Sequence, residues 1–324
     1  MRILRRLSRI DRRAVSGVVA APFVVWAAVR LLGLEPGWPV VQLVAFTPYV
    51  AGAAVLATAA LLTMRRWWAG AVAGLAALAL VAVVLPRAVP DGGGGGDGLA
   101  LRVLTANLLA GEGDERAVLD LVRRLDVDLL AVQEYTPKAE RGLDAAGVAR
   151  LLPYRASYPQ EGVTGSAVFS RHPLRDPAVR VQRGAFRQAR ATVLVPGAVP
   201  VEFESVHPMA PHARSTTGLW RQNLDAQPRA TPGGTVRVLA GDFNATLDHA
   251  ALRRLIDSGY RDAAAVTGAG LRHTWPYDER WYVPGVALDR VLADRRVGVR
   301  RVATHRTPAS DHKAFFAELT LPRG

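Results

Sequence analysis

The sequence contains no cysteine, so this chain can form neither disulfide bonds nor thiolate metal sites. This absence excludes disulfide-stapled folds and cysteine zinc sites, but it assigns no cellular compartment. Lysine is almost absent as well, because only Lys138 and Lys313 occur among 41 basic residues and all the others are arginine. Combined with abundant Ala, Val and Gly, this bias indicates a GC-rich coding genome rather than selection for arginine chemistry.

Acidic residues are scarce in the first 90 positions, where only Asp11 and Glu35 oppose ten arginines. That segment carries +8 of the formal net charge of +13, and the rest of the chain carries +5. Most of the excess positive charge therefore lies beside apolar segments. Such a distribution indicates orientation in a membrane rather than binding of nucleic acid.

Three apolar runs occupy this N-terminal region, at about residues 14–30, 40–64 and 69–85. A transmembrane helix needs about 20 apolar residues, and the second run exceeds that length. The first and third runs are shorter, but arginine side chains at their ends can reach the membrane interface. Because none of the runs has a polar face, we predict three transmembrane helices. A cleaved signal peptide is the alternative for the first run, although two more runs follow it.

Arginines flank the apolar runs unevenly. Six precede the first run, and Arg65 and Arg66 join the second run to the third, beside Trp67 and Trp68 as interfacial anchors. The positive-inside rule then places the N-terminus and the second loop in the cytoplasm. Three crossings put everything after Leu85 outside it. We therefore predict a multi-pass protein of the cell membrane with an extracytoplasmic C-terminal domain.

A glycine-rich segment at residues 91–98 separates the membrane anchor, residues 1–90, from the remaining chain. We interpret it as a flexible tether that holds the following domain close to the membrane surface. Residues 99–324 change to alternating short strands and helices, and about 225 residues are enough for one domain. The predicted strands are 101–105, 129–133, 166–170, 189–194, 201–207, 236–240, 288–293, 297–305 and 315–319. The predicted helices are 114–125, 213–226 and 250–258, so the domain is an α/β mixture with many strands and few helices.

Polar residues recur where these apolar strands end. Asp242 and Asn244 follow the strand from Val236, and two side chains that are two residues apart in an extended segment point the same way. A carboxylate can accept a proton from water, and a carboxamide can donate to an oxyanion, so the pair suits hydrolysis of a phosphate ester. Taken alone, the segment is equally well explained as an Asx turn. Glu134 and Asp311 add further carboxylates, and this oxygen-rich set favours Mg²⁺ or Mn²⁺ over zinc.

Four motifs occur in a fixed order: Leu130-Ala-Val-Gln-Glu134, Gly165-Ser-Ala-Val-Phe-Ser-Arg-His-Pro173, Gly241-Asp-Phe-Asn244 and Ser310-Asp-His312. In order and spacing they resemble the endonuclease/exonuclease/phosphatase superfamily, which includes deoxyribonuclease I. The resemblance covers about residues 99–321. It implies an α+β fold, a four-layer αββα sandwich (DNase I-like), which here would be preceded by the three transmembrane helices.

The resemblance also implies a role for each matching residue. Glu134 would be the principal metal ligand, Asn107 would help to hold metal or phosphate, and Asp311 would join the metal site. Asp242 would orient or deprotonate the attacking water, and Asn244 would bind the phosphate.

Three further residues complete the implied site. His312 would stabilise the charged phosphorane, Asp289 would orient the His312 ring, and His207 would be the extra histidine of the deoxyribonuclease-like and sphingomyelinase-like members. The sequence departs from the usual pattern around Asp289, where an isoleucine and an aromatic residue commonly flank the aspartate. Simpler explanations remain open: Asp289 as an ion-pair partner of Arg290 or Arg295, Asn107 as a turn residue, and His207 as a strand-end histidine.

The sequence thus predicts a membrane-anchored, extracytoplasmic, divalent-metal-dependent phosphoesterase. Three spans and a short tether favour a substrate concentrated at the membrane, such as a phospholipid or a lipid-linked cell-envelope pyrophosphate. The layout resembles actinobacterial membrane proteins associated with teicoplanin resistance. An extracytoplasmic nuclease is the alternative, although no lysine-arginine cluster marks a phosphate track, so nucleic acid is not favoured as a partner. A catalytically inactive membrane scaffold is a third possibility, which the intact set of polar residues disfavours.

Overall fold

The computed structural model describes residues 12–92, 98–277 and 282–324. The chain divides into two compact units. One unit comprises Met1–Pro86 with Asp248–Ala250, and the other comprises Arg87–Leu247 and Ala251–Gly324. The central part of the predicted glycine tether, residues 93–97, and the first arginines of the chain lie outside the described residues.

The first unit is helical. Its elements are α1 (Arg12–Leu32), α2 (Val40–Val44), α3 (Thr47–Thr63), α4 (Trp67–Val84) and the 3-10 helix η1 (Leu85–Ala88). Small residues such as Ala54, Ala69 and Ala73 are buried between the helices, whereas large side chains such as Leu56 and Leu75 are exposed. Helices that pack through small residues and direct large apolar side chains outward are typical of proteins in lipid.

Two of these helices, Ala14–Leu32 and Trp67–Ala88, are long and apolar enough to cross a membrane, by length and composition. The predicted second span, residues 40–64, does not form one helix. It divides into α2 and α3, and Pro48 lies in the first turn of α3, where its missing N–H breaks no helical hydrogen bond. Thr47–Thr63 is a shorter apolar helix. The number of spans, three, therefore remains a prediction.

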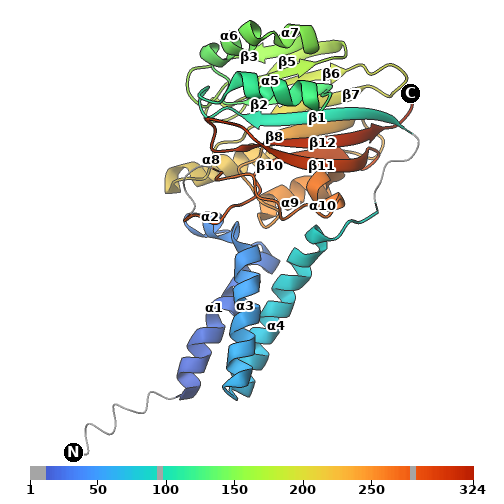
Figure 1. The fold of residues 1–324 in the computed structure, drawn as a ribbon. Coiled ribbons are helices and arrows are strands. Elements are labelled where there is room, and N and C mark those ends of the chain that lie inside the picture. Colours follow the sequence, from blue (N-terminus) through green and yellow to red (C-terminus); the bar gives the residue numbers. More distant parts are fainter. Residues whose placement is uncertain (1–11, 93–97, 278–281) are drawn as a thin grey trace, which may run out of the picture. The chain divides into compact units, whose positions relative to one another are not determined.

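The second unit contains two six-stranded sheets. The first has the strand order β11-β12-β1-β2-β4-β3 and the second has the order β5-β6-β7-β8-β10-β9. The strands are β1 (Leu99–Asn107), β2 (Leu129–Gln133), β3 (Tyr154–Tyr158), β4 (Ser166–Ser170), β5 (Leu174–Val181), β6 (Arg187–Val193), β7 (Val201–Val206), β8 (Val236–Asp242), β9 (Tyr260–Asp262), β10 (Asp289–Asp294), β11 (Gly298–Arg306) and β12 (Lys313–Leu321). Figure 1 shows β1, β12 and β11 running side by side, in agreement with the antiparallel pairing of β12 with both neighbours.

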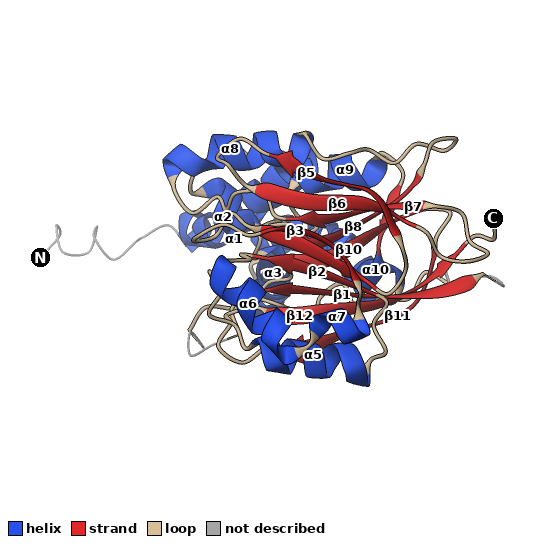
Figure 2. Cartoon of the chain, turned by 90° about the horizontal axis from the view of Figure 1, so that it is seen from above, coloured by secondary structure: helices blue, strands red, loops and turns tan. Residues whose placement is uncertain are grey.

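Helices cover the outer faces of both sheets. They are α5 (Glu115–Arg124), α6 (Pro137–Ala146), α7 (Val148–Leu151), α8 (Arg214–Asp225), α9 (Ala250–Asp257) and α10 (Ala263–Val266). In Figure 2, α5, α6 and α7 lie on one side of the paired sheets, and α8 and α9 lie on the other. The α+β class and the predicted pair of sheets with flanking helices are therefore confirmed.

Among the described residues, one apolar core lies between the two sheets and another joins the first sheet to its helices. Alternate strand residues, including Val103, Phe203 and Phe315, form the core between the sheets. The opposite face of the first sheet contributes Leu104 and Phe316, which pack with side chains from α5, α6 and α7. A period of two along each strand therefore supplies both faces of the first sheet with apolar side chains.

The sequence prediction finds the central strands and the edge strand β11, and it misses the edge strands β3, β5 and β9. β2 and β4 have the predicted bounds, and α5 is capped by the Asp114 carboxylate, which accepts from the Ala117 N–H at 3.0 Å. β3 and β5, which end the two sheets, were not predicted. Their solvent-exposed faces carry charged residues such as Arg155 and Asp176 in place of an apolar alternation. An edge strand needs less apolar burial, so its sequence signal is weaker.

Sheet register brings the strand ends together. β1 runs parallel to β2, with Asn107 opposite Gln133, and β7 runs parallel to β8, with Val206 opposite Gly241. β10 is antiparallel to β8, so that Asp289 pairs with Asp242. The carboxyl ends of two parallel pairs and the beginning of β10 thus form one polar edge.

Candidate active site

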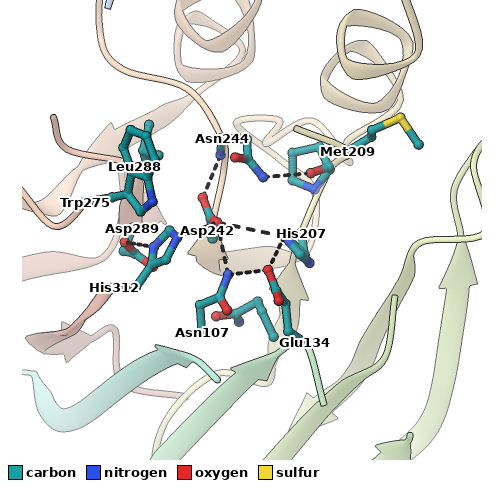
Figure 3. Close-up of polar contacts among 12 residues, drawn as sticks. Asn107, Glu134, His207, Met209, Asp242, Asn244, Trp275, Leu288, Asp289 and His312 are labelled. Atoms are coloured by element: carbon teal, nitrogen blue, oxygen red, sulfur yellow. Dashed lines mark hydrogen bonds and ion pairs between the residues drawn. The ribbon is translucent and has the colours of Figure 1, made fainter. Parts of the chain in front are cut away.

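All eight predicted site residues lie at this edge, on segments from both sheets. Asn107 ends β1, Glu134 follows β2, His207 follows β7, Asp242 ends β8, Asn244 lies two residues further on, Asp289 begins β10, and Asp311 and His312 immediately precede β12. Figure 3 shows Asn107, Glu134, His207, Asp289 and His312 arranged around the Asp242 side chain.

Glu134 is held in an unusual backbone conformation. Its φ of 54° lies in the left-handed region, which non-glycine residues seldom adopt and which often marks functional positions. One carboxylate oxygen accepts from the Asn107 amide at 3.1 Å, and the other accepts from the Ala110 N–H at 2.6 Å. Burial raises the pKa of Glu134, and these two hydrogen bonds oppose the increase. A largely buried carboxylate at such a position is expensive to maintain unless it binds a ligand.

Asp242 lies at the centre of the cluster. Its Oδ2 accepts from Asn107 Nδ2 at 3.2 Å and lies 3.6 Å from His312 Nε2 and 3.8 Å from His207 Nε2. Its Oδ1 accepts from the backbone N–H of Asn244 at 2.8 Å. Burial raises the pKa of Asp242, while the charge of His312 lowers it. A buried aspartate with a raised pKa is a better proton acceptor than an exposed one.

The two histidines have opposite protonation preferences. His312 Nδ1 lies 2.8 Å from Asp289 Oδ2. Burial lowers the pKa of His312, but the carboxylates of Asp289, Asp242 and Asp311 prevail and raise it to about 10. Burial lowers the pKa of His207, although Asp242 partly opposes this. At neutral pH His312 is therefore cationic and His207 is neutral, which gives the site an acid and an uncharged imidazole.

The neighbours of Asp289 bear on its proposed ion pair with Arg290. Arg290 donates to Asp262 Oδ2 at 2.7 Å, and both side chains are almost completely buried. The Thr274 hydroxyl accepts the backbone N–H of Asp289 at 3.0 Å. The Asp289 carboxylate is therefore directed at His312 rather than at the adjacent arginine.

Two predicted residues are placed differently from their implied roles. Asn244 Nδ2 donates to the Pro208 carbonyl at 3.1 Å, so its amide is already engaged with the backbone. Asn107 presents its nitrogen to Glu134 and Asp242, while its Oδ1 accepts from Leu109 N–H at 2.9 Å. Binding of phosphate by Asn244 and of metal by Asn107 remain predictions.

Several positioning residues escaped the sequence analysis. The Gln133 amide donates to the Ser205 hydroxyl at 2.9 Å, and that hydroxyl donates to the Val132 carbonyl at 3.1 Å. These bonds tie β2 to β7 directly behind Glu134 and His207. The Ser310 hydroxyl similarly donates to the Asn107 carbonyl at 2.8 Å. Gln133 and Ser310 lie within the quoted motifs but had no role assigned, and Ser205 shares its strand with Glu202 and Glu204, so nothing in the sequence singled it out.

The donor set fits a hard divalent cation. Carboxylates from both sheets, Glu134 and Asp242, accept from the same Asn107 nitrogen, and no cysteine is present to offer a soft ligand. Among the described residues, the ligand atoms of Asp242, Asp289 and His312 lie within 4.8 Å of one another and could together hold an ion. This group differs from the predicted set of Glu134, Asn107 and Asp311. The short contact between His312 Nδ1 and Asp289 Oδ2 already engages two ligand atoms of this group. The carboxylates of the predicted set, Glu134 and Asp311, are therefore more available to a cation.

Comparisons with known proteins agree with this geometry. A sequence model described as the Endonuclease/Exonuclease/phosphatase family matches residues 104–312. A structure of an endonuclease/exonuclease/phosphatase from Beutenbergia cavernae is 18% identical, covers 69% of this chain and 72% of its own, and has a TM-score of 0.54. Truncated TDP2 from Caenorhabditis elegans is 17% identical, with coverages of 68% and 98% and a TM-score of 0.53. TDP2 from D. rerio, complexed with a single strand DNA product, is 15% identical, with coverages of 68% and 99% and a TM-score of 0.52. No curated protein matches the chain. At these identities the solved structures establish the fold alone.

Proposed function

Because the chain belongs to the endonuclease/exonuclease/phosphatase family, we propose that it is a membrane-anchored, divalent-metal-dependent phosphoesterase acting on a lipid or lipid-linked phosphate. Members of this family are generally hydrolases of phosphoester bonds. The observation that carries the proposal is the convergence of Glu134, His207 and His312 on the Asp242 carboxylate. A merely structural cluster would have little reason to bury so many ionisable groups at one sheet edge.

The chain's own residues account for most of the proposed reaction. Asp242 orients a water molecule and accepts its proton as the water oxygen bonds to phosphorus. The bond from phosphorus to the leaving oxygen breaks, and that oxygen takes a proton from water. His312, held by Asp289, presents its second N–H to the charge that develops on the phosphoryl oxygens. His207 contributes a neutral imidazole on the opposite side of Asp242, and its ring is fixed by an edge contact with Phe186 at a centroid distance of 5.1 Å.

The proposed cation is Mg²⁺ or Mn²⁺, with Glu134 as its principal ligand and Asp311 as a further one. A bound divalent ion supplies Lewis-acid polarisation of the phosphoryl group. The Trp275 ring N–H donates to Asp311 Oδ2 at 2.9 Å and fixes the orientation of that carboxylate. Asn107 aligns Glu134 with Asp242 through its two amide hydrogen bonds.

The helical unit supports the membrane part of the proposal. Its large apolar side chains are exposed and its small ones are buried, and two helices have the length and composition of membrane spans. The arginine pattern of the sequence orients the catalytic domain outside the cytoplasm. A tether of a few residues keeps the domain near the bilayer, where lipid-linked phosphates are concentrated.

A nuclease is the second candidate, because one structural relative carries a single strand DNA product. The charge of this domain weighs against it, since residues 91–324 carry only +5 in total. Proteins that bind nucleic acid through the phosphate backbone usually concentrate Lys and Arg on one face. The inactive-scaffold alternative is disfavoured, because all eight predicted site residues are present and lie at one polar edge of the sheets.

The substrate class is tested by assaying the full-length chain in detergent micelles with Mg²⁺. Plasmid DNA, sphingomyelin and a polyprenyl pyrophosphate are compared at equal enzyme concentration, and Asp242→Asn serves as the inactive control. We expect hydrolysis of one of the two lipids to exceed nicking of DNA. Rapid DNA cleavage with both lipids left intact would replace the lipid proposal with the nuclease.

A further inference from the structure

A basic and aromatic cluster lies beside the active site. We name it the Tyr277 cluster, and it consists of His273, Tyr277, Arg306 and Lys313. The Arg306 guanidinium carbon lies 5.6 Å from the centroid of the Tyr277 ring, and the Lys313 ammonium nitrogen lies 5.8 Å from the same centroid. Lys313 Nζ is also 2.8 Å from His273 Nε2. Two cations and an imidazole thus gather around one aromatic side chain.

The positive charge of this cluster is not neutralised by the described part of the chain. Arg306 and Lys313 are directly opposite in the antiparallel pairing of β11 with β12, an arrangement in which like charges destabilise a sheet. No carboxylate among the described residues forms an ion pair with either side chain, although most other arginines of the sheets have such a partner. Arg306 and His273 are exposed, so an external anion can reach them. The Tyr277 ring compensates only part of this repulsion.

Backbone hydrogen bonds attach the cluster to the catalytic residues. The Tyr277 N–H donates to the Asp311 carbonyl at 2.9 Å, and the Lys313 N–H donates to the Thr274 carbonyl at 2.9 Å. Lys313 directly follows His312, so their Cα atoms are ~3.8 Å apart. Trp275 lies between Thr274 and Tyr277, and its ring centroid is 6.5 Å from that of His312. The cluster is therefore attached through the backbone to the segment that carries Asp311 and His312.

We propose that the Tyr277 cluster binds a second phosphate of the substrate, as in a diphosphate ester, while the scissile phosphate occupies the site around Asp242. This inference rests on the proposed phosphoesterase function and narrows its substrate class. A diphosphate places two anionic groups side by side, so that one can face His312 while the other faces Arg306 and Lys313. A zwitterionic headgroup such as phosphocholine would instead bring its own cation against Arg306 and Lys313.

The experiment measures competitive inhibition of bis(p-nitrophenyl) phosphate hydrolysis by the full-length chain in detergent, at constant free Mg²⁺. Inorganic phosphate, methylenediphosphonate and a short oligothymidylate are the three inhibitors. We expect methylenediphosphonate to bind more tightly than phosphate. Arg306→Gln and Lys313→Gln should each reduce that preference about tenfold, the usual scale for one charge-assisted hydrogen bond. Arg306→Lys should retain most of it, and Arg116→Gln, on the exposed face of α5, should not change it.

An unaltered preference in both glutamine variants would overturn the subsite while leaving the phosphoesterase intact. The glutamine variants could also lose oligothymidylate binding to the same extent as methylenediphosphonate binding. That result would assign the second phosphate to a polynucleotide and would also contradict the diphosphate proposal. If the chain hydrolyses no phosphodiester, the proposed function fails, and calorimetric titration of methylenediphosphonate still tests the subsite. Tenfold weaker binding to Lys313→Gln in that titration supports the subsite, and equal binding refutes it.

Discussion

Replacement of Asp289 by asparagine tests the arrangement that most distinguishes this site. The substitution keeps the size of the side chain and removes the negative charge that lies 2.8 Å from His312 Nδ1. The pKa of His312 is raised to about 10 although burial alone would lower it, and Asp289 is the foremost of the carboxylates responsible. The net increase from an ordinary value of about 6.5 corresponds to roughly 5 kcal/mol at about 1.4 kcal/mol per unit, and it remains after burial has opposed the carboxylates.

The sign of the pH effect follows from this raised pKa. Charged His312 stabilises the folded chain. This stabilisation is fully present below about pH 6.5, the pKa of His312 in the unfolded chain, and it is lost as the pH rises through about 10, its pKa in the folded chain. Asp289→Asn should lower the pH at which this stabilisation is lost. It should also shift the alkaline limb of the kcat/KM profile to lower pH. We expect kcat to fall by about 10²–10³-fold, the usual cost of removing one donor that stabilises the charge of the transition state.

The assay is a pH profile of bis(p-nitrophenyl) phosphate hydrolysis by the full-length chain. Asp294→Asn, at the opposite end of β10, is the matched control, because it also removes a buried carboxylate from an ion pair. The Asp289→Asn/His312→Gln double variant should be no slower than His312→Gln alone, since residues that act as a unit are not additive. An unshifted alkaline limb in Asp289→Asn, or full additivity in the double variant, would refute the pairing.

Three further predictions concern the metal, the fold and the topology. Glu134→Gln should weaken Mg²⁺ binding at least tenfold in calorimetric titrations, and unchanged affinity would remove Glu134 from the metal site. Gly241→Ala should lower stability by about 1–3 kcal/mol in thermal unfolding, because a Cβ there would lie 2.0 Å from the Val206 carbonyl oxygen. Gly233→Ala, which meets no atom within 4 Å, is its control, and equal melting temperatures of the two variants would contradict the argument. A phosphatase reporter fused after Gly98 should be active and a cytoplasm-dependent fluorescent reporter dark; the reverse pair of results would require an even number of crossings.

The sequence predicted the part of the fold that burial determines. β2 and β4 are buried along their whole length, and both were found with their observed bounds. β5 was not found, because it is an edge strand interrupted by a bulge between Arg175 and Ala178. The split of residues 40–64 into α2 and α3 was also missed, since an apolar run shows composition but not the turn that precedes Pro48.

The candidate site was predicted as a set of residues but not as a geometry. Motif spacing brought Asn107, Glu134 and Asp242 into one group, and the sheet register confirms their proximity. The direction of each amide could not be read from the sequence, because it depends on local backbone partners such as the Pro208 carbonyl that engages Asn244. The tie between Gln133 and Ser205 was equally hidden, since their separation of 72 residues carries no local pattern.

The most direct test of the central claim is the metal dependence of phosphoester hydrolysis at this site. Full-length chain in detergent is assayed with bis(p-nitrophenyl) phosphate after EDTA treatment, with and without readdition of Mg²⁺ or Mn²⁺, beside Glu134→Gln and Asp242→Asn. We predict that hydrolysis is lost with EDTA, returns with the cation, and is reduced at least 10²-fold in both variants. Hydrolysis that persists in EDTA, or that proceeds at the wild-type rate in both variants, would contradict the account.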